Sequence, residues 1–188
     1  MPGIGTALIY TLIRRFMSKN IGLFYGSTTG NTEDIAEMIA AALGKERVVL
    51  HDIAAEGIDQ LNQYSTLVLG IPTWDYGELQ EDWSDVWGEI DDMDLSGVTC
   101  ALFGLGDQIG YGEWFLDAMG ALHDKLVSRG AKLVGYWPVA GYSFEASKAL
   151  TQDESCFVGL ALDEDSQSDR SPERVEAWTA QVLAEFDY

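Results

Sequence analysis

The chain has 188 residues, 47% of them hydrophobic, which suits a single domain with a sizeable core. It contains 31 Asp and Glu but only 11 Lys and Arg, a formal net charge of −20 at pH 7. A charge of this sign and size repels nucleic acids and anionic membranes, so nucleic-acid binding is excluded and basic protein partners are favoured.

Residues 1–16 differ from the rest of the chain. Apolar side chains recur there at helical spacing, at Ile4, Leu8, Leu12 and Phe16. This stretch is too short to span a membrane, and it lacks the charged start and the small-residue cleavage site of a secretory signal. We expect residues 1–16 to be upstream sequence or a disordered tail, with a weak peripheral membrane anchor as the alternative. Since the rest of the chain gives no export signal, the expected compartment is the cytoplasm or an equivalent stroma.

Apolar runs alternate with helical patterns along residues 17–188, which predicts an α/β domain with a parallel sheet covered on both faces. The expected strands lie near residues 21–25, 48–50, 66–70, 99–103 and 132–136. The expected helices cover residues 33–43, 81–90 and 115–128, and a last helix begins at Ser171. The stretch from about 137 to 156 is too long for an ordinary loop and predicts an insertion. No linker or repeat indicates a second domain.

The most informative motif follows the first expected strand. It consists of Ser27, Thr28, Thr29, Gly30, Asn31 and Thr32 and leads into a helix. A helix N-terminus presents unpaired N–H groups and a positive dipole end, and the hydroxyl groups add further donors. The motif lacks the Gly-Lys-Ser/Thr ending of a P-loop and the spaced glycines of a dinucleotide fingerprint. We interpret it as a cradle for a phosphate monoester; the alternative is a loop that merely caps a helix.

Two further loops follow the strands expected near residues 66–70 and 99–103. The first contains Pro72, Thr73, Trp74, Asp75, Tyr76 and Gly77, and the second contains Leu105, Gly106, Asp107 and Tyr111. Loops at the carboxyl ends of parallel strands share one rim of the sheet, where ligands bind. Trp74 or Tyr111 alone would be read as a packing residue. Together with the phosphate cradle, these two aromatic faces indicate a flat phosphorylated heteroaromatic, and FMN fits best.

Residues 18–188 resemble a flavodoxin of the long-chain group, the small FMN-carrying electron-transfer proteins. The resemblance rests on Gly-Ser-Thr-Thr-Gly-Asn-Thr, Pro-Thr-Trp and Gly-Asp-Gln-Ile-Gly-Tyr in the three loops, and on a late segment over residues 141–165. It implies a doubly wound five-stranded parallel sheet of order 2-1-3-4-5, an order taken from the family. It also implies that the insertion interrupts the fifth strand, which resumes near residues 157–159.

The resemblance assigns roles to these loops. The first loop would bind the phosphate, and the other two would flank the isoalloxazine between Trp74 and Tyr111, with Tyr111 as the coplanar partner. The Asp75–Tyr76 peptide stands where the family bonds the flavin N5, although relatives often have a small residue where Tyr76 stands. Asp163 is implied near the ribityl chain, and Trp114 either contacts the cofactor or packs.

The implied function is that of a low-potential one-electron carrier, shuttling between semiquinone and hydroquinone and able to replace ferredoxin. No catalytic residue is expected. The partners would be basic faces of redox proteins, such as a ferredoxin/flavodoxin–NADP reductase, and the protein would be a monomer. Eight acids and no Lys or Arg occupy residues 78–94, beginning four residues after Trp74, which favours a docking surface. The alternative is a flavodoxin-like, FMN-dependent quinone or NAD(P)H reductase.

The remaining reactive side chains give weaker signals. Cys100 and Cys156 lack metal-ligand spacing, so we expect buried reduced thiols and no metal site. His51 and His123 have no evident catalytic neighbours, and we expect them at the surface or as satisfied core residues.

Overall fold

The computed structural model of this chain describes residues 20–186, so the expectations for residues 1–16 lie outside the described part. A central parallel sheet has the strand order β2-β1-β3-β5-β6. Its strands are β1 (Ile21–Tyr25), β2 (Val48–Asp52), β3 (Thr66–Trp74), β5 (Thr99–Leu105) and β6 (Lys132–Val134). This is the expected order, because the short strand β4 (Glu78–Leu79) only forms a hairpin with the end of β3.

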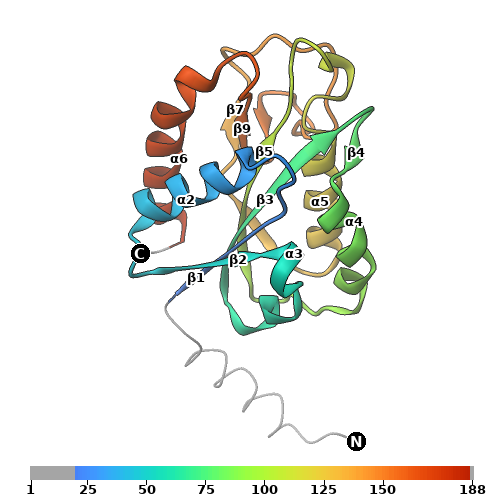
Figure 1. Ribbon diagram of the computed structural model, residues 1–188. Helices are drawn as coiled ribbons and strands as arrows, with labels where there is room; N and C mark the ends of the chain where they lie inside the picture. Colours follow the sequence, from blue (N-terminus) through green and yellow to red (C-terminus); the bar gives the residue numbers. More distant parts are fainter. Residues whose placement is uncertain (1–19, 187–188) are drawn as a thin grey trace, which may run out of the picture.

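Helices cover both faces of the sheet (Figure 1). On one face, α2 (Asn31–Leu43) and α6 (Ser171–Glu185) pack side by side, and Ile35, Ile39 and Trp178 are fully or almost fully buried there. The other face carries α4 (Glu81–Val86) and α5 (Asp117–Ser128), with Trp83 and Leu122 in its core. Apolar strands between two helical layers thus produce two cores and leave the strand ends free to carry loops.

The shorter elements refine the expected helices. The helix expected at residues 81–90 is α4 followed by a 3₁₀ segment, η2 (Trp87–Asp92). α5 begins at Asp117 rather than at residue 115, because Leu116 adopts a left-handed conformation with φ 63°. The other short helices are α3 (Ile53–Glu56), η1 (Asp59–Gln63), η3 (Gly112–Trp114) and η4 (Ser168–Arg170). Within the described residues, none of the helices is both long enough and apolar enough to cross a membrane.

The insertion interrupts the fifth strand, as expected. β6 pairs with the first half of β5, and β9 (Leu160–Leu162) pairs in parallel with its second half, from Phe103 to Leu105.

The predicted point of resumption, residues 157–159, was wrong. Cys156–Phe157 forms β8, which pairs antiparallel with β7 (Trp137–Pro138). The N–H of Val158 donates to the carbonyl of Ala149 at 2.8 Å, so the segment bonds to the insertion before it rejoins the sheet.

Candidate functional site

A cavity of about 350 Å³ opens at the carboxyl ends of β1, β3 and β5. The loops after these three strands supply most of its wall. The rest comes from the loop after residue 162, which contains Glu164 and Asp165 and is called the late acidic loop below. The lining residues are Thr28, Thr29, Asn31, Thr32, Pro72, Thr73, Trp74, Asp75, Leu105, Gly106, Asp107, Tyr111, Trp114, Phe115, Glu164 and Asp165. The three loops singled out in the sequence therefore meet at one site, and none of the described residues that line it is Lys or Arg.

The first loop is held in shape by its own side chains and by α4. Ser27 does not line the cavity; its Oγ accepts hydrogen bonds from the N–H groups of Gly30 and Glu33, at 3.2 and 3.4 Å. Gly30 also lies outside the lining and has φ 92°, a conformation that favours glycine, directly before α2. Ser27 and Gly30 thus fix the conformation of the loop, while Thr28, Thr29 and Thr32 line the cavity.

Two side chains at the start of α4, those of Gln80 and Asp82, hold this loop in place by hydrogen bonds. The amide nitrogen of Gln80 donates to Thr28 Oγ1 at 3.0 Å and to Asp82 Oδ2 at 2.6 Å. Asp82 Oδ2 also accepts from the backbone N–H of Ser27 at 3.2 Å. Asp82 was grouped in the sequence with a solvent-facing acidic run, but its carboxylate belongs to the support of the first loop.

Aromatic residues from two different loops line the cavity. Trp74 ends β3, and Tyr111 follows β5 with 45% of its surface exposed. Tyr76 lies outside the lining and is 68% exposed, with its ring edge-on to Trp114 and Tyr111 at centroid distances of 5.1 and 6.3 Å. Trp74 and Tyr111 can therefore offer flat apolar faces to a ligand, whereas Tyr76 contacts Trp114 in a T-shaped arrangement.

The turn between β3 and β4 has an unusual backbone. The N–H of Gly77 donates to the carbonyl of Trp74 at 3.1 Å and closes the turn. Asp75 has φ 43° and Gly77 has φ 89°. A left-handed conformation is unfavourable for a residue with a side chain, and strain of this kind clusters at functional sites.

Asp163 is buried and is absent from the lining of the cavity, although Glu164 and Asp165 beside it are part of that lining; its implied place near the ribityl chain stays a prediction. Its Oδ2 accepts from the backbone N–H and the side-chain amide of Gln108, at 3.1 and 2.8 Å, and from the Ser166 hydroxyl at 2.6 Å. Its Oδ1 accepts from the N–H groups of Asp165 and Ser166. Asp163 thus ties the loop after β5 to the late acidic loop.

Burial raises the pKa of Asp163, but the hydrogen bonds from Ser166 and Gln108 outweigh it and hold the pKa below its ordinary value. A carboxyl group with a lowered pKa in the folded state stabilises the fold above its unfolded pKa, near 4, and loses that contribution as the pH falls through the folded value. We expect Asp163→Asn to lower the free energy of unfolding by about 2–3 kcal/mol at pH 7. Urea unfolding at pH 7 and at a pH below about 4 tests this, since the difference from the parent should shrink at the lower pH.

Asp124 provides the matched control, because its side chain is 85% exposed and Asp124→Asn should change stability little. An Asp163→Asn loss no larger than that of Asp124→Asn would contradict this role of Asp163.

Sequence reasoning missed three lining residues: Phe115, Glu164 and Asp165. The sequence placed Phe115 at the start of a helix. Asp163, Glu164 and Asp165 are consecutive acids, and nothing in the sequence indicates which of them faces the cavity. Burial, together with the charges of Asp107 and Asp163, raises the pKa of Asp165. The late loop therefore brings negative charge to the wall of the cavity.

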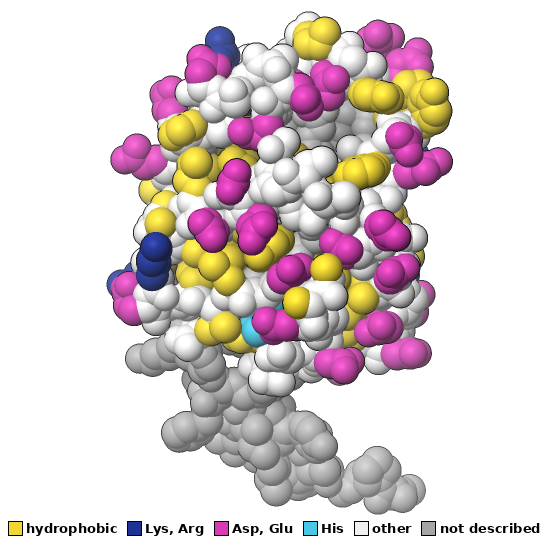
Figure 2. All heavy atoms as spheres, viewed as in Figure 1, with side chains coloured by type: hydrophobic (Ala, Val, Ile, Leu, Met, Phe, Trp, Pro, Cys, Tyr) yellow, Lys and Arg dark blue, Asp and Glu magenta, His cyan; other side chains and the backbone are white. Residues whose placement is uncertain are grey.

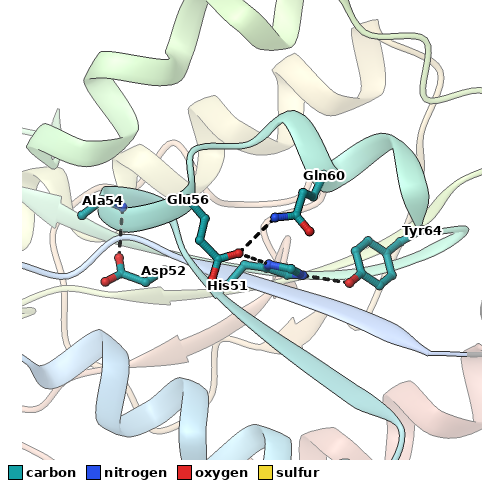
Figure 3. Close-up of polar contacts among 6 residues, drawn as sticks. All are labelled: His51, Asp52, Ala54, Glu56, Gln60 and Tyr64. Atoms are coloured by element: carbon teal, nitrogen blue, oxygen red, sulfur yellow. Dashed lines mark hydrogen bonds and ion pairs between the residues drawn. The ribbon is translucent and has the colours of Figure 1, made fainter.

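His51, Cys100 and Cys156 lie outside the lining of the cavity. His51 is buried, with Nδ1 2.6 Å from Glu56 Oε2 and Nε2 2.8 Å from the Tyr64 hydroxyl (Figure 3). Its ring stacks on Phe24 at 4.3 Å, so it is a satisfied core residue. Cys100 is a buried free thiol, and burial raises its pKa to about 12. Cys156 is also free but only half-buried, which corrects the expectation of full burial.

Both the sequence and the fold of this chain are similar to those of known proteins. The flavodoxin family profile matches residues 23–178, most of the chain. The chain belongs to the flavodoxin family. It is 55% identical over 167 residues to flavodoxin 2 of Escherichia coli, covering 89% of this chain and 96% of that protein. It is 51% identical over 170 residues to the flavodoxin of Nostoc sp., covering 90% and 99%. Relatives of this length confirm the long-chain group.

The structural comparison agrees with the sequence comparison. The crystal structure of Fusobacterium nucleatum flavodoxin bound to flavin mononucleotide superposes on this flavodoxin with a TM-score of 0.84 at 30% sequence identity. The match covers 88% of this chain and 98% of that one. The flavodoxin fold predicted from the sequence is thereby confirmed.

Proposed function

We propose that this flavodoxin carries single electrons on one FMN held in the cavity at the rim of the sheet. One observation supports this above all: a loop of uncharged donors and two aromatic residues from different loops line the same cavity. Hydroxyl groups and a helix N-terminus suit a phosphate monoester, and aromatic faces suit the flavin ring. FMN has both parts, and its redox chemistry would be supplied by the isoalloxazine.

The residues of the chain would bind and orient the cofactor. Ser27 to Thr32 would hold the phosphate, Pro72 to Gly77 would flank one side of the ring, and Leu105, Gly106, Asp107 and Tyr111 would flank the other. The lining suggests adding Phe115, Glu164 and Asp165 to this set. Trp114 also belongs to it, while Asp163 would act by holding two of the loops together.

The acidic surroundings would set the reduction potential. A carboxylate about 10 Å from a developing negative charge opposes it by roughly 1.7 kcal/mol at an effective dielectric constant near 20. Asp107, Glu164 and Asp165 all line the cavity. Their charges make the second electron harder to add, which is the property of a low-potential carrier. Flavodoxins are electron-transfer proteins rather than enzymes, and these residues need only bind, shield and repel charge.

The partners of a flavodoxin are redox proteins. For this chain, a basic docking face, such as that of a ferredoxin/flavodoxin–NADP reductase or another low-potential oxidoreductase, is the proposed complement. Acidic side chains are spread over the face seen in Figure 2, where basic ones are few. In α4 and η2, Glu81, Asp85 and Glu89 are exposed and form no ion pair within the described residues. Monomeric association state and a cytoplasmic or stromal compartment stay predictions.

This function is tested by the preference for FMN over FAD and by the rate of NADPH oxidation. The protein freed of cofactor should quench the fluorescence of one equivalent of added FMN and bind FAD far more weakly. With FMN bound, it should not oxidise NADPH at a significant rate until a partner reductase is added. Rapid NADPH oxidation by the purified protein alone would instead support the alternative, an FMN-dependent quinone or NAD(P)H reductase.

A further inference from the structure

The buried carboxylate of Asp117 lies directly against the turn that joins β3 to β4. Asp117 is the first residue of α5 and is 3% exposed. A Cβ atom added at Gly77 would lie 2.9 Å from Asp117 Oδ2 and 3.2 Å from Trp114 Cδ1, so only glycine fits this close approach. Next to Asp117, the N–H of Ala118 donates to Thr73 Oγ1 at 3.1 Å. The start of α5 is therefore bonded to the same strand that carries the turn.

Lys148, in the insertion, engages both oxygen atoms of this carboxylate. Oδ1 accepts from the backbone N–H of Lys148 at 2.8 Å, and Oδ2 lies 3.0 Å from its Nζ. The backbone of the insertion also packs tightly on α5, since a Cβ atom added at Gly120 would be 2.3 Å from the carbonyl oxygen of Lys148. Asp117 is thus fixed by the insertion on one side and contacts the turn on the other.

The turn needs support of this kind. A hydrogen bond from the N–H of Gly77 to the carbonyl of Trp74 closes it, and among the described residues only two pairs, Thr73–Leu79 and Trp74–Glu78, join the strands on either side. Asp75 within the turn and Leu116 next to Asp117 both have positive φ, at 43° and 63°. Backbone strain persists only where the surrounding structure holds it.

We propose that Asp117 is a positioning residue for the Trp74–Gly77 turn, and that its pairing with Lys148 makes the insertion part of the cofactor site. The link to the cofactor rests on the proposed function, because Trp74 and Asp75 line the cavity assigned to FMN. Removing the ammonium group of Lys148 leaves a buried carboxylate without its counter-ion. The carboxylate then moves toward solvent, and the turn above it opens more often.

The test is Lys148→Met in the full chain, because the Lys148 side chain is 70% exposed and its loss should leave the fold intact. Lys148→Arg should restore the pairing, and Lys45→Met removes an exposed lysine elsewhere as the matched control. Amide hydrogen exchange at Gly77, measured without cofactor, should be about 10-fold faster in Lys148→Met and parent-like in the other two. The thermal unfolding midpoint should fall by only a few degrees in Lys148→Met and return to the parent value in Lys148→Arg.

A second measurement uses the FMN-loaded protein. The midpoint potential of the second one-electron reduction should shift in Lys148→Met and return in Lys148→Arg. Equal Gly77 exchange in Lys148→Met and the parent would overturn the proposal, as would Gly77 exchange in Lys148→Arg as fast as that in Lys148→Met. The exchange experiment needs no flavin, so a failure to bind FMN would contradict the proposed function while leaving the exchange result valid.

Discussion

Replacing Trp74 or Tyr111 with alanine is expected to weaken FMN binding by about 1–3 kcal/mol, which is roughly 5- to 150-fold in the dissociation constant. Both residues line the cavity; Trp74 is the last residue of β3, and Tyr111 lies in the loop after β5. Each substitution removes apolar contact area and a stacking face from the ring. Fluorescence titration of the cofactor-free variants with FMN measures the effect directly.

The two substitutions should differ in their redox effect. Tyr111 is 45% exposed, so it forms part of the boundary between the cavity and solvent. Removing it should admit water to the ring and raise the potential of the second reduction, because water stabilises the added negative charge. Tyr111→Phe and Trp74→Phe keep an aromatic face and should bind FMN nearly as the parent does. Unchanged affinity in both alanine variants would show that the aromatic residues only pack.

Reversing the charge of Glu81, Asp85 and Glu89 to lysine is expected to slow association with a partner reductase by about 10-fold or more at low salt. These side chains are exposed on α4 and η2. Asp82 is left unchanged because its carboxylate accepts the N–H of Ser27, so its reversal would disturb the first loop. Stopped-flow electron transfer should also lose most of its salt dependence in the variant, since charges beyond about 10 Å are screened at 0.1 M salt.

Glu37, Glu173 and Glu176 offer the control, because they are exposed on α2 and α6, on the other face of the sheet. Their reversal changes the net charge equally and should affect association less. FMN affinity and the absorption spectrum should be nearly unchanged in both variants. If the traces of the α4/η2 variant superimpose on those of the parent from low to high salt, the acidic run is only a solvated surface.

The rim of the site could be predicted because its signals are local. Glycine-rich and hydroxyl-rich loops directly follow apolar runs, and a parallel sheet brings the carboxyl ends of its strands together. Thr28, Trp74 and Tyr111 therefore reach one cavity although they are far apart in sequence. The length of residues 137–156 indicated an insertion, and the resemblance to the flavodoxin family implied that it interrupts the fifth strand.

What the sequence could not reveal depends on contacts between distant segments. Phe157 and Val158 look like residues of the central sheet, yet the pairing of β8 with β7 and the bond from Val158 to Ala149 keep them with the insertion. Asp163, Glu164 and Asp165 are adjacent acids in an irregular loop, which has no periodicity to tell which of them faces inward. The hydrogen bond that the Asp82 carboxylate accepts from the N–H of Ser27 could not be predicted either, because Asp82 stands within a run of acidic residues.

Stepwise reduction of the purified protein, followed by absorption spectroscopy, tests the central claim most directly. With one FMN bound, we expect two separate one-electron steps. The long-wavelength absorption of a neutral, one-electron-reduced flavin should rise to a maximum near half reduction and then disappear. A single two-electron step without that intermediate band, or bound FAD in place of FMN, would contradict the assignment of this chain as a one-electron carrier.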